Sequence, residues 1–296
     1  MYKNLNTEGL GISGRQSELI ELALSYGFKG LDLDIEAFQK QVETRGLGHA
    51  RRLLDSAKLK IGGFDLPVAW RGDDEAFKSD LERLPQWAQA ASEVGATGCR
   101  TTIFPACDDR PYHENFEFHR HRFTDIAEAL APFSIRLGLD FIAPAGRREG
   151  RVHQFISSPD ALLLLIKTTG ATNIGVAVDL WHWHVSGGTL DQLSGLTAEQ
   201  IVMVRVADVP DDVELELIQE HQRLLPGESG VVDTVAVLAL LSQLGYDGPV
   251  TPFPNASRFS GMTRDRIVRQ SSETLETQMK AAKLGVVASE PAADGG

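Results

Sequence analysis

The feature that most constrains the fold of this chain is an alternation of short apolar runs with longer amphipathic stretches. Runs of this length are typical of buried strands, and the stretches have the length and apolar spacing of helices. Strands that alternate with helices favour a parallel sheet joined by right-handed crossovers. We predict strands at residues 10–13, 30–35, 60–66, 99–105, 136–142, 174–180, 201–209 and 249–254. We predict helices at residues 16–26, 46–57, 74–94, 115–131, 158–169, 190–194, 232–244 and 263–284.

Eight such units fit a closed barrel better than an open doubly wound sheet. An open sheet that binds a dinucleotide would carry a G-x-G-x-x-G sequence after its first strand. Residues 10–15 (LGISGR) contain two glycines but not the third. We therefore predict an α/β fold, a single (β/α)8 TIM barrel over residues 1–285. Residues 286–296 are small and polar, and we predict a disordered tail there.

The composition narrows the class of partner. A formal net charge of -12 at pH 7 argues against nucleic acid or an anionic membrane surface, because both attract clustered Lys and Arg. No apolar run approaches the ~20 residues of a membrane span, and the N-terminus lacks the apolar segment of a secretory signal. Cys99 and Cys107 are too few for a disulfide framework. We expect a cytoplasmic protein with a small-molecule partner, without nucleic acid or membrane.

The predicted sixth strand carries the strongest candidate for a functional site. Its apolar, β-branched residues end at Asp179, and His182 follows three residues later. In a β/α barrel the chemistry lies at the C-terminal ends of the strands, so both side chains are expected at the mouth of the site. The pair could hold a divalent metal or transfer a proton. The alternative is that Asp179 caps the loop and His182 lies on the surface.

Charged side chains also occur at the ends of the neighbouring strands. Asp140 closes the predicted fifth strand, and with Asp179 it could share Mg²⁺ or Mn²⁺. Without a metal, two close carboxylates would raise one pKa and share one proton. Arg205 on the seventh strand could neutralise one carboxylate in place of a cation, or form a purely structural ion pair. Arg223 could bind a substrate oxygen, or anchor its own loop.

Aromatic side chains gather near the predicted strand ends. Trp70, Trp181 and Phe253 could stack on the apolar face of a sugar ring, or could serve only in packing. A histidine-rich stretch of the fourth helix looks suited to a metal. However, His119 and His121 are two residues apart and do not face each other on a helix. We expect the His/Arg face of this helix to be solvated or to edge the pocket.

Five segments together carry a family resemblance. They are residues 27–33 (GFKGLDL), 137–140 (LGLD), 174–182 (IGVAVDLWH), 223–227 (RLLPG) and 245–250 (GYDGPV). In this order and at barrel spacing, the chain resembles the xylose isomerase-like sugar phosphate isomerase/epimerase superfamily. That superfamily includes ketose 3-epimerases, inosose dehydratases and endonuclease-IV-like barrels. The resemblance implies the barrel fold and a sugar-like substrate, without specifying which one.

The resemblance also implies a metal site that this chain has altered. Active members hold one divalent metal through Glu, Asp, His and Glu on strands five to eight. The matching positions here are Asp140, Asp179, Arg205 and Phe253, and His182 matches a histidine after strand six. A guanidinium stays protonated and offers no lone pair to a metal, and phenylalanine offers no ligand atom. Asp140 and Asp179 alone are expected to bind Mn²⁺ or Mg²⁺ weakly if at all.

The implied function is a sugar or polyol isomerase or epimerase that moves a proton beside a carbonyl, with altered or absent metal dependence. Asp140 or Asp179 would be the base. His182 and Arg223 would bind substrate oxygens, and Arg205 would stabilise the enediolate. Elimination from a keto-sugar or an inosose, as in a dehydratase, needs the same first proton abstraction and is the neighbouring option.

Two alternatives belong to other classes. Loss of the Glu and His ligands would also suit a non-catalytic sugar-binding or regulatory barrel, which holds hydroxyl groups without turnover. Phosphodiester cleavage fits poorly, because it uses several metals and His ligands that the chain lacks. A homo-oligomer is compatible with the amphipathic stretch 264–284, which could pack on its own barrel or on a partner.

Overall fold

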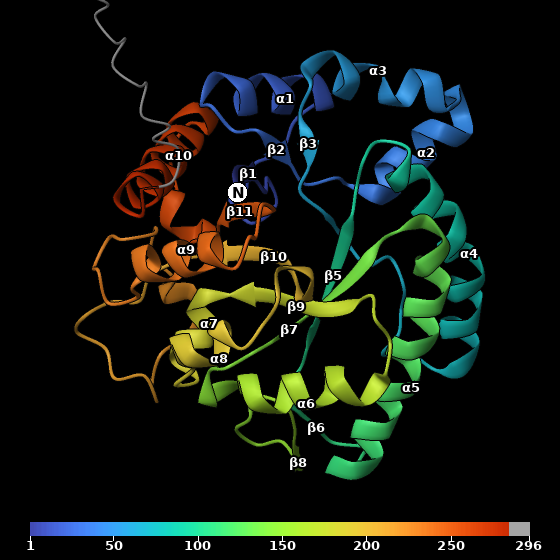
Figure 1. The fold of residues 1–296 in the computed structure, drawn as a ribbon, viewed down its shortest axis with the longest axis vertical. Coiled ribbons are helices and arrows are strands. Elements are labelled where there is room, and N and C mark those ends of the chain that lie inside the picture. The colour runs from blue at the N-terminus through green and yellow to red at the C-terminus, as the bar shows by residue number, and fades with distance from the viewer. Residues whose placement is uncertain (284–296) are drawn as a thin grey trace, which may run out of the picture.

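Parallel strands form a barrel at the centre of the structure (Figure 1). The computed structural model describes residues 1–283. The barrel strands are β1 (Tyr2–Leu5), β2 (Gly30–Leu31), β3 (Lys60–Ile61), β4 (Phe64–Asp65), β5 (Gly98–Ile103), β7 (Arg136–Phe141), β9 (Ile174–Asp179), β10 (Ile201–Val206) and β11 (Pro249–Pro252). Their order is β3-β2-β1-β11-β10-β9-β7-β5-β4. Only Gly62 and Gly63 separate β3 from β4, so these are two halves of one strand and the order closes into a ring, as predicted.

Helices surround the strands (Figure 1). They are α1 (Gln16–Ser25), α2 (Ile35–Arg45), α3 (Leu47–Ala57), α4 (Asp74–Ser92), α5 (Tyr112–Leu130), α6 (Pro159–Thr169), α7 (Leu180–Val185), α8 (Leu190–Ser194), α9 (Thr234–Gln243) and α10 (Arg264–Ala281). A short antiparallel pair, β6 (Ala106–Cys107) with β8 (His153–Gln154), lies outside the barrel. Because the helices cover the strands, β9 and β10 are buried along their whole length, as parallel strands usually are.

The first predicted strand is wrong. Residues 10–13 form a turn and irregular backbone, and the first strand is β1 instead. Its polar residues break the apolar pattern on which the prediction rested. Asn4 is nevertheless buried, because its Nδ2 donates to Asp32 Oδ1 (2.6 Å) and to Thr251 Oγ1 (2.9 Å) inside the barrel. Helices α2 and α7 were not predicted either.

An irregularity in β10 sets the register at the end of the barrel that carries the site. The pairing of β10 with β9 shifts between Ile201 and Met203, after which Arg205 lies directly beside Asp179. On the other side of Arg205, the neighbour is Thr251 of β11. The shift therefore decides which residue of β10 stands next to the carboxylate that ends β9.

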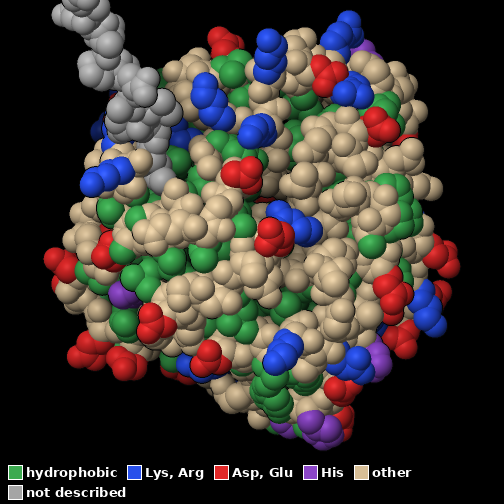
Figure 2. All heavy atoms as spheres, in the orientation of Figure 1, with side chains coloured by type: hydrophobic (Ala, Val, Ile, Leu, Met, Phe, Trp, Pro, Cys, Tyr) green, Lys and Arg blue, Asp and Glu red, His purple; other side chains and the backbone are tan. Residues whose placement is uncertain are grey.

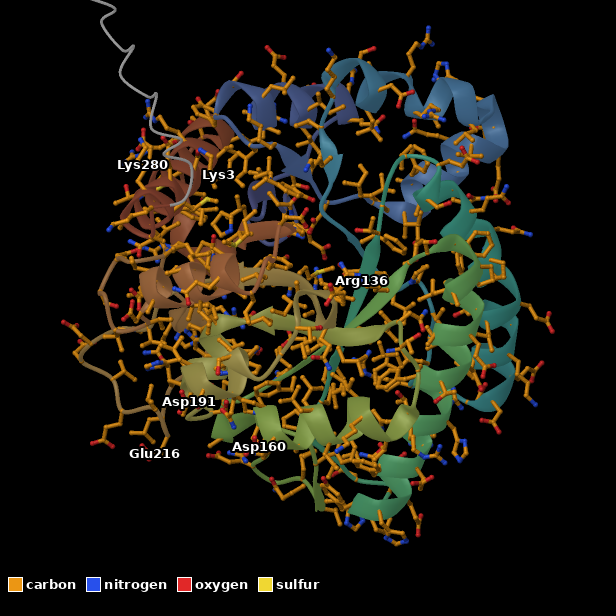
Figure 3. The ribbon with its side chains drawn as sticks, in the orientation of Figure 1. Lys3, Arg136, Asp160, Asp191, Glu216 and Lys280 are labelled. Atoms are coloured by element: carbon orange, nitrogen blue, oxygen red, sulfur yellow. The ribbon has the colours of Figure 1, made fainter. Side chains whose placement is uncertain are left out.

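Helix α10 packs on its own barrel. It contacts α1, α9, β1 and β11, which accounts for most of the amphipathic stretch 264–284. Glu276 binds Lys3 of β1 (2.9 Å) and Lys280 (2.7 Å), and both lysines are labelled beside α10 in Figure 3. The predicted tail, residues 286–296, lies outside the described residues.

Charged side chains of both signs cover the outer surface. On the face shown in Figure 2, Lys and Arg are interspersed with Asp and Glu. Within residues 1–283, none of the helices combines the length and the apolar character that a membrane crossing requires.

Candidate functional site

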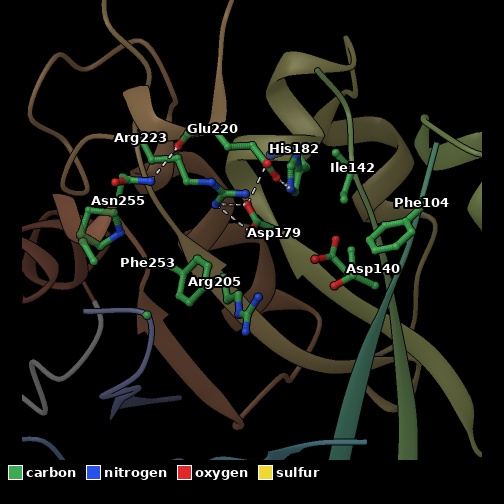
Figure 4. A pocket seen from close by; sticks show the side chains of 14 residues that line it. Phe104, Asp140, Ile142, Asp179, His182, Arg205, Glu220, Arg223, Phe253 and Asn255 are labelled. Atoms are coloured by element: carbon green, nitrogen blue, oxygen red, sulfur yellow. Dashed lines mark hydrogen bonds and ion pairs between the residues drawn. The ribbon is translucent and has the colours of Figure 1, made fainter. Parts of the chain in front are cut away.

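A cavity of about 440 Å³ opens where several barrel strands end (Figure 4). It collects side chains from the ends of β5, β7, β9 and β10, from the loop after β10, and from the segment after β11. The lining residues are Gly9, Thr102, Phe104, Asp140, Ile142, Asp179, His182, Arg205, Glu220, Arg223, Phe253, Pro254, Asn255 and Ala256. The carboxyl ends of parallel strands meet at one edge, so residues far apart in sequence come together here.

Asp179 and Arg223 form a buried ion pair. Arg223 Nη1 donates to both carboxylate oxygens of Asp179, at 3.0 and 2.8 Å, and the two residues are only 6% and 3% exposed. Asp179 also caps α7 by accepting from the backbone N–H groups of Trp181 and His182. Burial acts to raise the pKa of Asp179, but the guanidinium and these hydrogen bonds outweigh it and lower that pKa. Asp179 is therefore an ionised, fully engaged carboxylate.

The pKa of Asp140 is shifted in the opposite direction. Asp140 ends β7, is 4% exposed, and accepts one hydrogen bond from the backbone N–H of Phe141 (2.8 Å). It forms no ion pair with any residue in 1–283. Burial, and then repulsion from the ionised Asp179, raise the pKa of Asp140 well above its usual 3.8. The two neighbouring carboxyl groups thus have pKa values that are pushed apart.

We expect this raised pKa to show in the pH dependence of stability. Folded Asp140 keeps a proton that the unfolded chain releases above about pH 4, so its contribution is full below that pH and is lost as pH rises. Asparagine has no proton to lose. The free energy of unfolding of Asp140→Asn relative to the wild type should therefore rise steadily above about pH 4, as measured by urea denaturation. A difference that stays flat with pH would contradict the assigned state of Asp140.

His182 is a buried, neutral hydrogen-bond donor rather than a surface residue. It is 3% exposed, and burial followed by the charge of Arg223 lowers its pKa to about 3. Its Nδ1 lies 3.2 Å from the backbone nitrogen of Ala143 and accepts that N–H. The ring proton is therefore on Nε2, which lies 3.8 Å from Oε1 of Glu220 at the cavity. The cavity thus contains an N–H donor next to a second carboxylate.

Arg205 does not neutralise either aspartate, contrary to one of our expectations. Arg223, from the following loop, pairs with Asp179 instead. Arg205 is 7% exposed and packs against Phe253, with its guanidinium carbon 3.9 Å from the ring centroid. Within residues 1–283, its Nη2 has no hydrogen-bond partner. Arg205 therefore brings an unpaired guanidinium to the cavity (Figure 4).

Two of the three aromatic candidates do not line this cavity. Trp70 is buried, donates from Nε1 to Thr101 Oγ1 (2.8 Å), and packs edge-on against His119. Trp181 is also buried and supports the guanidinium of Arg223, 4.6 Å from its ring. Of the three candidates only Phe253 lines the cavity, and its ring also contacts Arg205. The expectation of a solvated or pocket-edging His/Arg face on α5 is wrong for His119, which is buried.

Glu220, Asn255, Thr102 and Phe104 also line the cavity, and the sequence analysis assigned none of them a role. Glu220 belongs to a short 3₁₀ turn, Glu220–Gln222, in the loop after β10. The signal that could have found it is its place in a loop that follows a barrel strand, since such loops build barrel sites. Its Oε2 also lies 3.6 Å from Nε of Arg147.

The fold and the cavity define the class of this protein, a β/α barrel with a mixed-charge site at the carboxyl ends of its strands. The family model described as xylose isomerase-like TIM barrel matches residues 20–278. The chain belongs to the xylose isomerase-like TIM barrel family, which confirms the resemblance seen in the sequence.

Individual relatives are more distant. An inosose isomerase of Bacillus velezensis is 22% identical over 153 residues, which are 52% of this chain and 51% of that protein. The chain spans about half the length of the curated relatives of this kind. The structure of a xylose isomerase domain protein from Alicyclobacillus acidocaldarius has a TM-score of 0.86 at 26% identity, covering 95% of this chain and 99% of that one. The structure of the IolI protein with a bound zinc atom has a TM-score of 0.75 at 12% identity, covering 96% and 98%, and shares the fold alone.

Proposed function

We propose that this protein is a sugar or polyol isomerase or epimerase that moves a proton at the carbon beside a carbonyl. The observation that carries the proposal is the contrast between the two neighbouring aspartates. Asp179 is ionised and engaged by Arg223, whereas Asp140 is unpaired, has a raised pKa and faces the cavity. Two carboxyl groups whose pKa values are pushed apart are a common arrangement for acid–base chemistry.

Asp140 is the proposed proton-transfer group. A carboxylate whose pKa is raised is a stronger base, and it holds the proton long enough to return it. It would take the proton from the carbon while the electron pair moves onto the carbonyl oxygen, which Nε2–H of His182 can hydrogen-bond. Isomerisation follows when the hydroxyl proton on the deprotonated carbon passes to the former carbonyl oxygen and Asp140 returns its proton to the adjacent carbon. Delivery to the opposite face of the same carbon, for epimerisation, needs a second group, and Glu220 is the remaining carboxylate that lines the cavity. Arg205 would stabilise the enediolate.

The residues at the four family ligand positions do not fit a divalent cation. Asp179 already uses both oxygens on Arg223, and the raised pKa of Asp140 lets a proton compete with a cation for its carboxylate. Arg205 and Phe253 supply no ligand atom. Across the described part of the chain, no three His, Cys, Asp or Glu side chains are grouped so that they could hold a metal. We therefore propose proton transfer without Mn²⁺ or Mg²⁺.

The proposal includes a small sugar-like partner and a cytoplasmic location. The cavity volume of about 440 Å³ falls in the range of small-molecule sites. Both cysteines, Cys99 and Cys107, are unpaired thiols, which suits a reducing compartment.

The test is solvent exchange followed by NMR. The protein is incubated in D2O with ketoses, inososes and keto acids, each with EDTA and, separately, with added Mn²⁺. We expect one deuterium beside the carbonyl of at least one compound, at the same rate under both conditions. Deuterium exchange that requires Mn²⁺ would contradict the proposed metal-free proton transfer. Saturable binding of a sugar without deuterium exchange would contradict the proposed enzyme and favour the non-catalytic sugar-binding barrel.

A further inference from the structure

Arg205 differs from the other buried arginines because it has no ion-pair partner. Three arginines within residues 1–283 are almost completely buried. Arg122 donates to Asp74 at 2.6 Å, and Arg223 donates to Asp179 at 2.8 Å. Arg205 pairs with no carboxylate in the described chain, and its Nη2 has no acceptor. A buried guanidinium without a counter-charge is unfavourable, and proteins seldom keep one unless something else supplies the charge.

The cavity's own acids do not supply it. Both oxygens of Asp179 accept from Arg223, and Glu220 lies beside Arg147 and His182 rather than beside Arg205. Asp140 forms no ion pair with Arg205 or with any other residue in 1–283. Figure 4 shows Arg205 next to Phe253, apart from the Asp179–Arg223 pair and from Asp140. The missing negative charge must come from a bound molecule.

We propose that the substrate is a carboxylate-bearing sugar derivative, such as an aldonate, a uronate or their keto acids, whose carboxylate binds Arg205. This inference rests on the proposed function and names its substrate class. The planar guanidinium fork matches the two oxygens of a carboxylate. Phe253 packs against the guanidinium, and Arg205 lines the cavity that the carboxylate would enter.

A carboxylate fits this site better than a phosphate. A phosphate carries a second charge and a third oxygen, which need further cations or backbone N–H groups. Lysine is absent from the lining, and the lining's other arginine, Arg223, is occupied by Asp179. The single unpaired positive charge of Arg205 is therefore matched by the single negative charge of a carboxylate.

The experiment compares matched acids and neutral compounds by isothermal titration calorimetry on the full chain. D-glucuronate is paired with D-glucose, and D-glycerate with glycerol, so each pair differs in one carboxylate. We expect at least one acid to bind about tenfold or more tightly than its neutral partner, the size of a charge-assisted contact. Arg205→Gln should abolish this preference. Arg147→Gln, which removes the same charge outside the cavity lining, should keep it.

Three results would overturn the inference: equal affinities within both pairs, no saturable binding of either acid at millimolar concentration, or a preference that survives Arg205→Gln. Tighter binding of D-glucose 6-phosphate than of D-glucuronate would reassign Arg205 to a phosphate. The readout is binding, so it does not depend on turnover. A carboxylate preference without deuterium exchange would contradict the proposed function and leave this inference standing.

Discussion

Replacing Arg223 with methionine is expected to lower the free energy of unfolding by about 3–5 kcal/mol at neutral pH. The substitution keeps much of the side chain's apolar length but leaves Asp179 as a buried carboxylate without its cation. Both oxygens of Asp179 lose the partner that they have at 2.8 and 3.0 Å. Urea denaturation followed by circular dichroism measures the loss. The loss should shrink at lower pH, because Asp179 can then bind a proton instead.

Two further variants test the cause of that loss. In Arg223→Met with Asp179→Asn, the asparagine can still cap α7 through its oxygen, and no buried charge is left alone. This double variant should be more stable than Arg223→Met by itself. Arg205→Met removes an equally buried guanidinium that has no carboxylate partner, so it should cost little or even stabilise the ligand-free protein. Equal losses for the Arg205 and Arg223 variants would show that the ion pair is not the reason.

The second large effect is expected from Asp140→Asn, which should slow solvent deuterium exchange by about 10²–10⁴-fold. Asparagine has nearly the same shape as a protonated aspartate and can keep the hydrogen bond from Phe141 N–H. It cannot take a proton from carbon. Ligand affinity should therefore change little, and the melting temperature should not fall, while exchange is lost. The measurement is the initial rate of deuterium incorporation by NMR.

The matched control is Asp160→Asn in the first turn of α6, which makes the same chemical change at an exposed residue that does not line the cavity. It should exchange at the wild-type rate. Glu220→Gln distinguishes the two proposed reactions. The rate of epimerisation should fall more than the rate of isomerisation, because only epimerisation uses Glu220 to deliver a proton. Exchange at the wild-type rate in Asp140→Asn would remove Asp140 from the mechanism.

Much of the site could be predicted because of the barrel's geometry. Asp140, Asp179 and Arg205 each stand at the end of an apolar run, and parallel strands bring such ends to one edge of the sheet. Phe253 follows the last strand in the same way. All four line one cavity. Their roles, as opposed to their positions, stay predictions until they are tested.

Other features depend on contacts that no local pattern encodes. β1 escaped prediction because Asn4 satisfies its polar group with Asp32 and Thr251, which are distant in sequence. Trp70 looked like a ligand platform, but α5 covers it with His119. In each case, burial is decided by a partner on another element rather than by the residue's own neighbours in sequence.

The alternation of strands and helices in the sequence by itself determined the barrel and the end of the barrel at which the charged residues gather, and five sequence segments carried the family resemblance. Only the tertiary structure decided which arginine neutralises which acid. Arg205 is adjacent to Asp179 in the strand register, yet Arg223 from the loop makes the ion pair. The reason is physical: strand periodicity fixes where a backbone position lies, whereas an ion pair depends on where the ends of long side chains meet. That pairing leaves Asp140 without a cation and Arg205 without an anion, and the proposed chemistry follows from these two unpaired groups.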